Sequence, residues 1–97
     1  MRGDAPDSAE KYCEQMGQDF GKKVMDERQS GTPKSKVTTI VGQFEKKKVR
    51  QITYAIVDKA YKIEQFDKAS KREEAIEAFA ARAKILCLLV LAEEEEK

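Results

Sequence analysis

Histidine and tryptophan are both absent from this chain of 97 residues. Without histidine, the chain lacks the side chain that most often acts as a general base near neutral pH. It also contains no phosphate-binding loop, nucleophile elbow, zinc-ligand spacing or dinucleotide fingerprint. Its carboxylates stand mostly beside lysines, on helix faces that we expect to be exposed, so no acid and base are paired. We therefore expect a protein that is not an enzyme and that needs no cofactor.

Cysteine is scarce, with two copies, Cys13 and Cys87, far apart in the chain. Both lie on predicted apolar helix faces, where a free thiol behaves as a small hydrophobic group. We expect two buried thiols in a reducing cytoplasm, and a disulfide is the alternative. Two cysteines without histidine cannot supply an ordinary four-ligand zinc site, so we expect no metal.

Long apolar runs are missing as well. The apolar run at residues 85–92 holds eight residues, far fewer than the ~20 that a membrane-spanning helix needs. No basic and apolar leader opens the chain, which gives no support to a signal peptide. We expect a cytoplasmic protein without membrane contact, folded as one domain over residues 1–97. Residues 1–6 are expected to form a flexible lead-in and residues 93–97 a frayed acidic tail.

The most regular pattern lies at residues 70–96. Ser70 and Glu73 have the spacing of a capping box, which predicts a helix start. Apolar residues then recur at steps of three and four along one helical face: Ile76, Phe79, Ala80, Ala83, Leu86, Cys87 and Val90. Because the run that follows is apolar all round, the helix needs cover on more than one side. We predict a helix over residues 71–92 that is the most buried element, with a protein interface at Ile85, Leu88, Leu89 and Ala92.

The N-terminal third is expected to form one helix that begins at Asp7 or Ser8 and ends before Gly31. Its apolar stripe consists of Ala9, Tyr12, Cys13, Met16, Phe20 and Val24. Gly17 and Gly21 lie inside this pattern, four residues apart. They would allow another helix to approach closely; the alternative is two tolerated glycines in a modest helix.

A second start signal stands at Thr32 and Pro33, because threonine can cap a helix and proline fits its first position. The apolar spacing after it favours a helix, although the β-branched run at residues 37–41 favours a strand. A hairpin with residues 49–57 as its second strand is the alternative. The connection at residues 45–48 lacks the glycine or asparagine of a tight hairpin turn, so we favour the helix.

A third amphipathic helix is expected over residues 49–66, either separate from the second or continuous with it. Short connections between amphipathic helices favour antiparallel neighbours. The sequence therefore predicts an all-α fold: a small antiparallel bundle of three or four helices with an apolar C-terminal helix.

Charge is unevenly distributed along the chain, although the net charge is only +1. Residues 33–62 hold eight basic and two acidic residues, while the flanking thirds are both net negative. Such a block can contact nucleic-acid phosphates without reading sequence. The candidate nucleic-acid-binding residues are Lys34, Lys36, Lys46, Lys47, Lys48 and Arg50. A solvated charge run is the alternative, and Tyr54 and Tyr61 would either stack on bases or lie half-buried in the bundle.

The first predicted helix contains Ala9, Glu10 and Gly17, and a threonine and a serine open the basic helix that follows. This combination resembles the small helical subunit of type III CRISPR effector complexes. In that second helix the matching residues are Thr32, Ser35, Lys36 and Val37. The resemblance spans about residues 9–48, and the family's later leucine–lysine–proline and tyrosine–alanine segments have no convincing counterpart here. It implies a non-catalytic subunit that lines a filament, with four basic residues towards the guide or target backbone: Lys34, Lys36, Lys47 and Arg50.

These features predict a non-enzymatic helical subunit of a larger assembly. Protein subunits would bind its C-terminal helix, and single-stranded nucleic acid would contact its basic middle segment. The alternative is a homodimeric structural or regulatory protein that does not bind nucleic acid. The acidic tail would be solvated, or it would meet a basic surface, either the lysines at residues 46–48 of a second copy or a larger partner.

Overall fold

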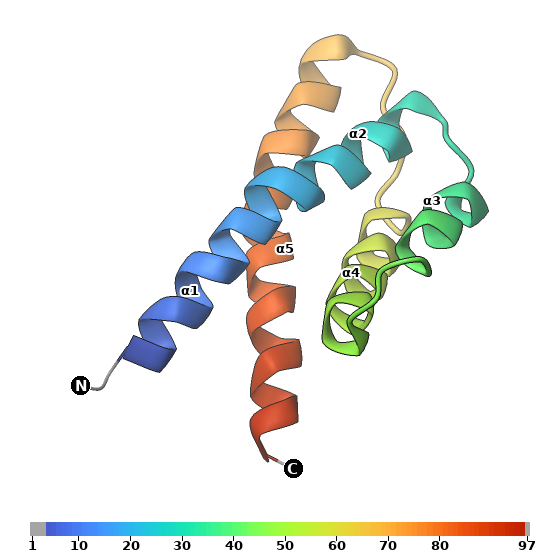
Figure 1. Ribbon diagram of the computed structural model, residues 1–97. Helices are drawn as coiled ribbons and strands as arrows, with labels where there is room; N and C mark the ends of the chain where they lie inside the picture. The colour runs from blue at the N-terminus through green and yellow to red at the C-terminus, as the bar shows by residue number, and fades with distance from the viewer. Residues whose placement is uncertain (1–3, 97) are drawn as a thin grey trace.

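The computed structural model describes residues 4–96 of the chain, and the surroundings of side chains for residues 8–93. These residues form helices joined by turns, with no strand among them, which confirms the predicted all-α fold. Figure 1 shows a long N-terminal rod that crosses the C-terminal helix α5 (Ala69–Glu96), with the shorter helices α3 and α4 to one side of α5. The molecule is elongated, with extents of 48 × 26 × 18 Å.

The N-terminal rod consists of α1 (Asp4–Met16), a wide π-helical turn η1 (Gly17–Gly21) and α2 (Lys22–Ser30), which follow one another without a break. It begins at Asp4, earlier than the sequence predicted, and the first three residues of the expected lead-in lie outside the described part of the chain. The rod ends as predicted, because Gly31 takes the left-handed conformation with φ 91°.

The wide turn η1 lies where the rod crosses α5. A Cβ atom added at Gly17 would stand 2.3 Å from the main-chain oxygen of Ala80, and one at Gly21 would stand 2.6 Å from the Cβ of Ala83. Real side chains do not approach this closely, so α5 occupies the space that a larger residue would need. The two glycines therefore permit the close approach of a second helix, as one interpretation of their spacing proposed.

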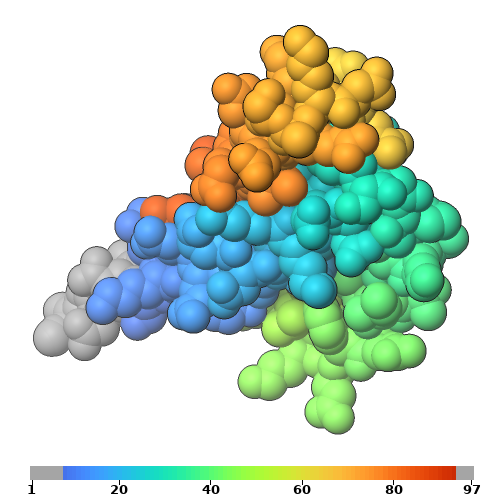
Figure 2. Space-filling model, turned by 90° about the horizontal axis from the view of Figure 1, so that it is seen from above, coloured from blue at the N-terminus to red at the C-terminus, as the bar shows by residue number. Residues whose placement is uncertain are grey.

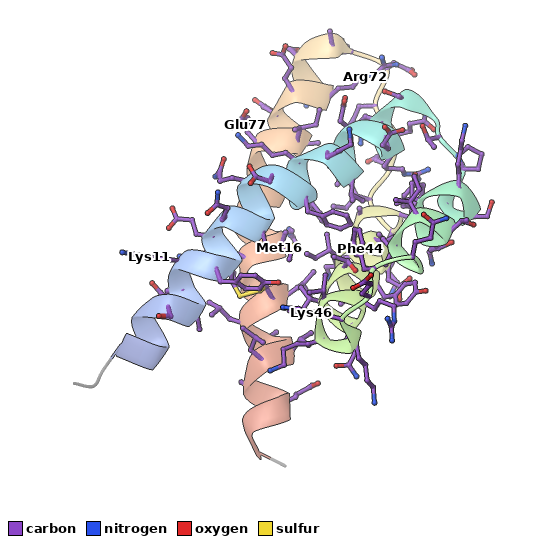
Figure 3. The ribbon with its side chains drawn as sticks, in the orientation of Figure 1. Lys11, Met16, Phe44, Lys46, Arg72 and Glu77 are labelled. Carbon is purple, nitrogen blue, oxygen red and sulfur yellow. A yellow bond between two sulfur atoms is a disulfide. The ribbon has the colours of Figure 1, made fainter. Side chains whose placement is uncertain are left out.

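Cys13 and Cys87 form a disulfide between α1 and α5, which Figure 3 shows next to the crossing. The expectation of two free thiols is therefore wrong. Their Cα atoms are 5.5 Å apart because the helix crossing brings the two apolar faces together, a proximity that their sequence separation of 74 does not reveal. Disulfides persist mainly in oxidising compartments, so this bond weighs against the predicted cytoplasmic location.

The middle of the chain folds as two helices, α3 (Lys34–Val41) and α4 (Lys47–Ala60). The helical interpretation is thus confirmed against the hairpin, and a turn that starts at Gly42 separates the two helices. Thr32 does not cap α3, because the extended residue Pro33 immediately precedes that helix. The hydroxyl of Thr32 instead donates a hydrogen bond to the carboxylate of Glu27, which ties the turn back to α2.

Helix α4 ends at Ala60, six residues before the predicted end, because side chains of α2 hold the following loop (residues 61–68) in a non-helical form. The Arg28 Nε donates a 2.8 Å hydrogen bond to the carbonyl of Ile63. The buried Gln29 donates to the carbonyl of Glu64 at 2.9 Å and accepts from the amide of Phe66 at 2.8 Å. These bonds replace the helical ones that the loop backbone would otherwise make.

Helix α5 begins at Ala69, so Ser70 lies inside its first turn and the predicted capping box is wrong. The helix continues to Glu96, beyond the predicted end at Ala92, so residues 93–96 of the expected tail belong to α5, and the last residue of that tail lies outside the described part of the chain. Helix α5 contacts α1, η1, α2 and α4 and is the centre of the bundle. It is not the most buried element: α4 buries five of its 14 residues, whereas α5 buries four of its described residues over twice the length.

Candidate protein and nucleic-acid interfaces

Helix α5 has one face in the core and one in solvent. The core face consists of Phe79, Ala80, Ala83 and Cys87, each at most 4% exposed. The opposite face, which we call the outer stripe, consists of Ala78, Ala81, Ile85, Leu88, Leu89 and Ala92. All of these are exposed except Leu88, which is partly buried. Ile85 and Leu89 are each 56% exposed, a large fraction for aliphatic side chains in the middle of a helix.

The outer stripe contains all four residues of the predicted protein interface and extends it by about two turns, from Ile85 to Ala78, towards the N-terminus of α5. The sequence prediction missed Ala78 and Ala81, although their spacing continues the steps of three and four from Ile85. Leu86, predicted as a core residue, is only partly buried. The C-terminal half of α5 is thus covered on its inner side and uncovered on its outer side.

Contacts with the N-terminal rod fix the orientation of α5. The disulfide and the glycine crossing hold the core face, and two salt bridges lie along the flank of the helix. Lys22 Nζ is 3.1 Å from the Glu77 carboxylate, and Lys84 Nζ is 3.9 Å from the Glu10 carboxylate. Because the covalent bond and the tight crossing determine the rotation of α5 about its axis, the outer stripe is held facing outward.

The predicted basic residues do not gather in one patch. Lys34, at the start of α3, forms a 2.8 Å salt bridge with Asp58 near the end of α4. Lys46, Lys47 and Lys48, which we call the lysine triplet, lie at the opposite end of α4. At 1.5 Å per residue, the eleven residues from Lys47 to Asp58 place these two groups ~16 Å apart along the helix. The antiparallel packing of α3 and α4 therefore divides the basic block in two.

Two other predicted nucleic-acid-binding residues, Arg50 and Lys36, lie against other parts of the fold. The Arg50 guanidinium donates hydrogen bonds to the main-chain oxygens of Phe44 at 2.6 Å and Glu45 at 3.0 Å, so it closes the turn before α4. Phe44 in turn packs edge-on against Phe20 of η1, with ring centroids 6.3 Å apart. Lys36 lies on the wall of a groove between the N-terminal rod and α3.

This groove has a volume of about 240 Å³ and an apolar floor. Val24, Val37 and Val41 form the floor, and Ile40, 55% exposed, stands on its wall. Ordinary small-molecule pockets have volumes of about 300–1,000 Å³, so the groove is small for a ligand site.

The lysine triplet remains the best-placed part of the basic block. Lys46 immediately precedes α4, and Lys47 and Lys48 form its first residues, all exposed at the helix end that carries the positive dipole. Figure 2 shows the region around the start of α4, in light green, projecting from the edge of the molecule. Such a projection is accessible to a long polyanion.

The two tyrosines do not form a pair for stacking on bases. Tyr61 lies just past the end of α4, where its hydroxyl donates a 2.7 Å hydrogen bond to the carbonyl of Thr32. The Arg28 guanidinium lies over its ring, with Cζ 5.4 Å from the ring centroid. Burial raises the pKa of Tyr61, as does the charge of Glu27, and the charge of Arg28 partly offsets both. Tyr61 is therefore a structural residue, while Tyr54, 39% exposed, lies in the middle of α4.

Among residues 4–96, no helix is long and apolar enough to cross a membrane. The same residues contain no group of three or more histidine, cysteine or acidic side chains placed to hold a metal ion. Comparison of the chain with protein-family models, with curated proteins and with solved structures finds no match.

Proposed function

We propose that this chain is a non-enzymatic helical subunit that docks in a larger assembly through the outer stripe of α5. The observation that carries the proposal is the exposure of Ile85 and Leu89, each 56%, on a helix whose other face is the core of the fold. A contiguous apolar stripe on a held helix is typical of an interface, because a partner that covers it removes apolar surface from water.

The lysine triplet is the second part of the proposal: it contacts phosphate groups of a single-stranded nucleic acid without reading its sequence. Support comes from the exposure of three adjacent lysines at the positive end of α4. Lys34 and Arg50 are engaged within the chain, so they contribute less than their charge suggests. The resemblance to the small subunit of type III CRISPR effector complexes would make this polyanion a guide or target strand.

The docking surface can be tested with a matched pair of substitutions. Ile85→Glu places a charge on the outer stripe, and Ile40→Glu places the same charge on an isoleucine of equal exposure on α3, which is 55% exposed against 56%. Tagged variants are produced at native level in the source cells, and the particle that contains the chain is sized by gradient sedimentation. We expect Ile85→Glu to release the chain as a small free species and Ile40→Glu to leave the particle intact. If both variants remain in a particle of wild-type size, the outer stripe is not the docking surface.

The phosphate contact is tested by a salt titration of binding to single-stranded RNA and DNA of mixed sequence. Replacing the lysine triplet with alanine should lower the slope of log affinity against log salt by ~2, because each lost contact with a single strand removes ~0.7. The control replaces three other exposed lysines, Lys62, Lys68 and Lys71, and so has the same net charge. An unchanged slope in the triplet variant, or an equal loss in the control, would rule out a local contact at the triplet.

A further inference from the structure

We infer that the disulfide between Cys13 and Cys87 is a redox switch that controls the docking of helix α1. In the oxidised chain the bond holds α1 against α5, and reduction releases α1 while the rest of the bundle stays folded. The switch is independent of the docking role proposed for the outer stripe. Its basis is the position of the bond, the small number of other contacts that hold α1, and the separate contacts that hold α2.

The disulfide lies at the outer end of the helix crossing. Gly17 and Gly21 meet α5 at Ala80 and Ala83, and the bonded cysteines lie about one turn further out on each helix. Beyond the bond, α1 and the C-terminal part of α5 diverge towards the two ends of the chain (Figure 1). The bond thus joins the two helices where they separate, and the part of α1 before it projects from the bundle.

Few other contacts hold α1. Cys13 is the one buried residue among residues 8–16, the part of α1 whose side chains the structure describes, and Ala9 and Met16 are partly buried. The salt bridge from Lys84 to Glu10 is 3.9 Å long with the carboxylate side chain 63% exposed, and an exposed ion pair contributes little. Once undocked, α1 has 13 residues, a length at which a helix without packing is marginal in water, so it unfolds.

Separate contacts hold the rod on the other side of the crossing. Val24 and Met25 of α2 are buried in the core. Arg28 and Gln29 donate hydrogen bonds to main-chain carbonyls of the loop after α4, and Gln29 also accepts one from that loop. Because these contacts do not involve α1, they persist when the disulfide is broken. The release therefore ends at Gly17, which also weakens the continuation of the helix from η1 into α1.

The co-reactant of the switch is a dithiol. One thiolate of the dithiol attacks a sulfur atom of the disulfide, and the other cysteine leaves as a thiolate. The second thiol of the reductant then displaces the cysteine that it holds. Two electrons and two protons pass from the dithiol, which becomes a disulfide, to Cys13 and Cys87, which become thiols. Both cysteines are 0% exposed in the oxidised chain, so the attack requires a local opening of the two helices.

The first test is hydrogen exchange of the full chain, followed by mass spectrometry before and after reduction with dithiothreitol. In the reduced chain, the amides of residues 8–16 should exchange within ~10-fold of the rate of an unstructured peptide. The amides of residues 52–60 in α4 should remain at least ~100-fold slower than that rate. Protection retained in residues 8–16 would overturn the inference, because the other contacts would then suffice to hold α1. Loss of protection in both segments would also overturn it, because the bond would then hold the whole fold.

The second test measures the accessibility of the Cys13 thiol in the reduced chain. Its rate of reaction with iodoacetamide should lie within ~10-fold of the rate in the urea-unfolded chain, because release exposes a side chain that is fully buried when α1 is docked. A slower reaction would show that α1 stays docked after reduction, and would overturn the inference. As the control, Cys13→Ala/Cys87→Ala should show the exchange pattern of the reduced chain without reductant. A protected α1 in this variant would mean that the bond is not what holds the helix.

Discussion

Gly17→Ala should destabilise the fold although alanine is the better helix former. The new Cβ would lie 2.3 Å from the main-chain oxygen of Ala80 and 3.2 Å from the main-chain nitrogen of Lys84. Both obstacles are backbone atoms of α5, so no side-chain rotation can relieve the contact. Ordinary van der Waals contact begins near 3.4 Å, so η1 and α5 must separate by about 1 Å.

The magnitude follows from two opposing terms. A gap of 0.5–1 Å loses about a quarter to a half of the dispersion energy of each contact across it, and overpacking of a core costs ~1–3 kcal/mol or more. The contacts at risk include those of the buried Phe79 and Ala83. Replacing glycine with alanine in a helix returns ~1 kcal/mol. Because the obstacle is a backbone atom, we expect the overpacking cost to lie at or above the upper end of this ~1–3 kcal/mol range. After the gain in helix propensity is subtracted, the free energy of unfolding should fall by ~2 kcal/mol. In a domain of this size, that loss lowers the melting temperature by ~8–16 °C.

Circular dichroism at 222 nm during thermal and urea unfolding measures the effect. Gly42→Ala is the matched control, because its Cβ would first meet the far end of the partly exposed Tyr54 side chain, at 3.1 Å, and its backbone already has an ordinary φ of −63°. We expect the control to change the stability by less than ~0.5 kcal/mol. A Gly17→Ala protein as stable as the wild type would refute the close crossing of η1 and α5. An equal loss in Gly42→Ala would show that the effect is not specific to the crossing.

Three further predictions concern the contacts that hold the bundle. Gln29→Ala should cost ~2–3 kcal/mol in urea unfolding, because it leaves a carbonyl and an amide of the following loop without their partner; a loss below ~0.5 kcal/mol would contradict this. Burial raises the pKa of Tyr61 above its ordinary value of 10.0, so its stabilising contribution is intact below pH 10.0 and lost as the pH rises through the folded-state pKa. The stability difference between the wild type and Tyr61→Phe should therefore shrink above pH 10.0, and a constant difference in a pH series of melting curves would refute it. Reduction should lower stability by ~4 kcal/mol through release of the loop closed by Cys13 and Cys87, and Cys13→Ala/Cys87→Ala should show no response to reductant.

The sequence predicted the helices where local patterns and packing agree. Gly31 ends α2 because the left-handed position after a helix favours glycine, and that preference is local. Residues 37–41 fold as a helix despite their β-branched side chains, because Val37 and Val41 are four apart and both are buried on one side. The apolar spacing therefore outweighed the local preference for a strand.

The errors lie where distant segments determine the local structure. Helix α4 stops at Ala60 because Arg28 and Gln29, about 35 positions earlier, take the hydrogen bonds of the loop. The disulfide has the same origin, since only the helix crossing brings Cys13 to Cys87. No local pattern encodes these contacts.

The candidate sites were predicted in part for similar reasons. The large residues of the outer stripe are visible as a surplus of apolar side chains on α5, whereas Ala78 and Ala81 carry too little hydrophobic signal to stand out. The basic block looked continuous in sequence, but the antiparallel course of α3 and α4 separates Lys34 from the lysine triplet.

The most direct test of the central claim is the accessibility of the outer stripe in the working assembly. Leu89→Cys and Ile40→Cys place a thiol at two sites of nearly equal exposure, 56% and 55%, and the rate of maleimide modification is measured in the dilute chain and in the native particle. The outer-stripe account predicts that the rate at position 89 falls at least ~10-fold on assembly and that the rate at position 40 is unchanged. Equal rates at position 89 in both states would show that no partner covers the outer stripe, and would contradict the proposed function.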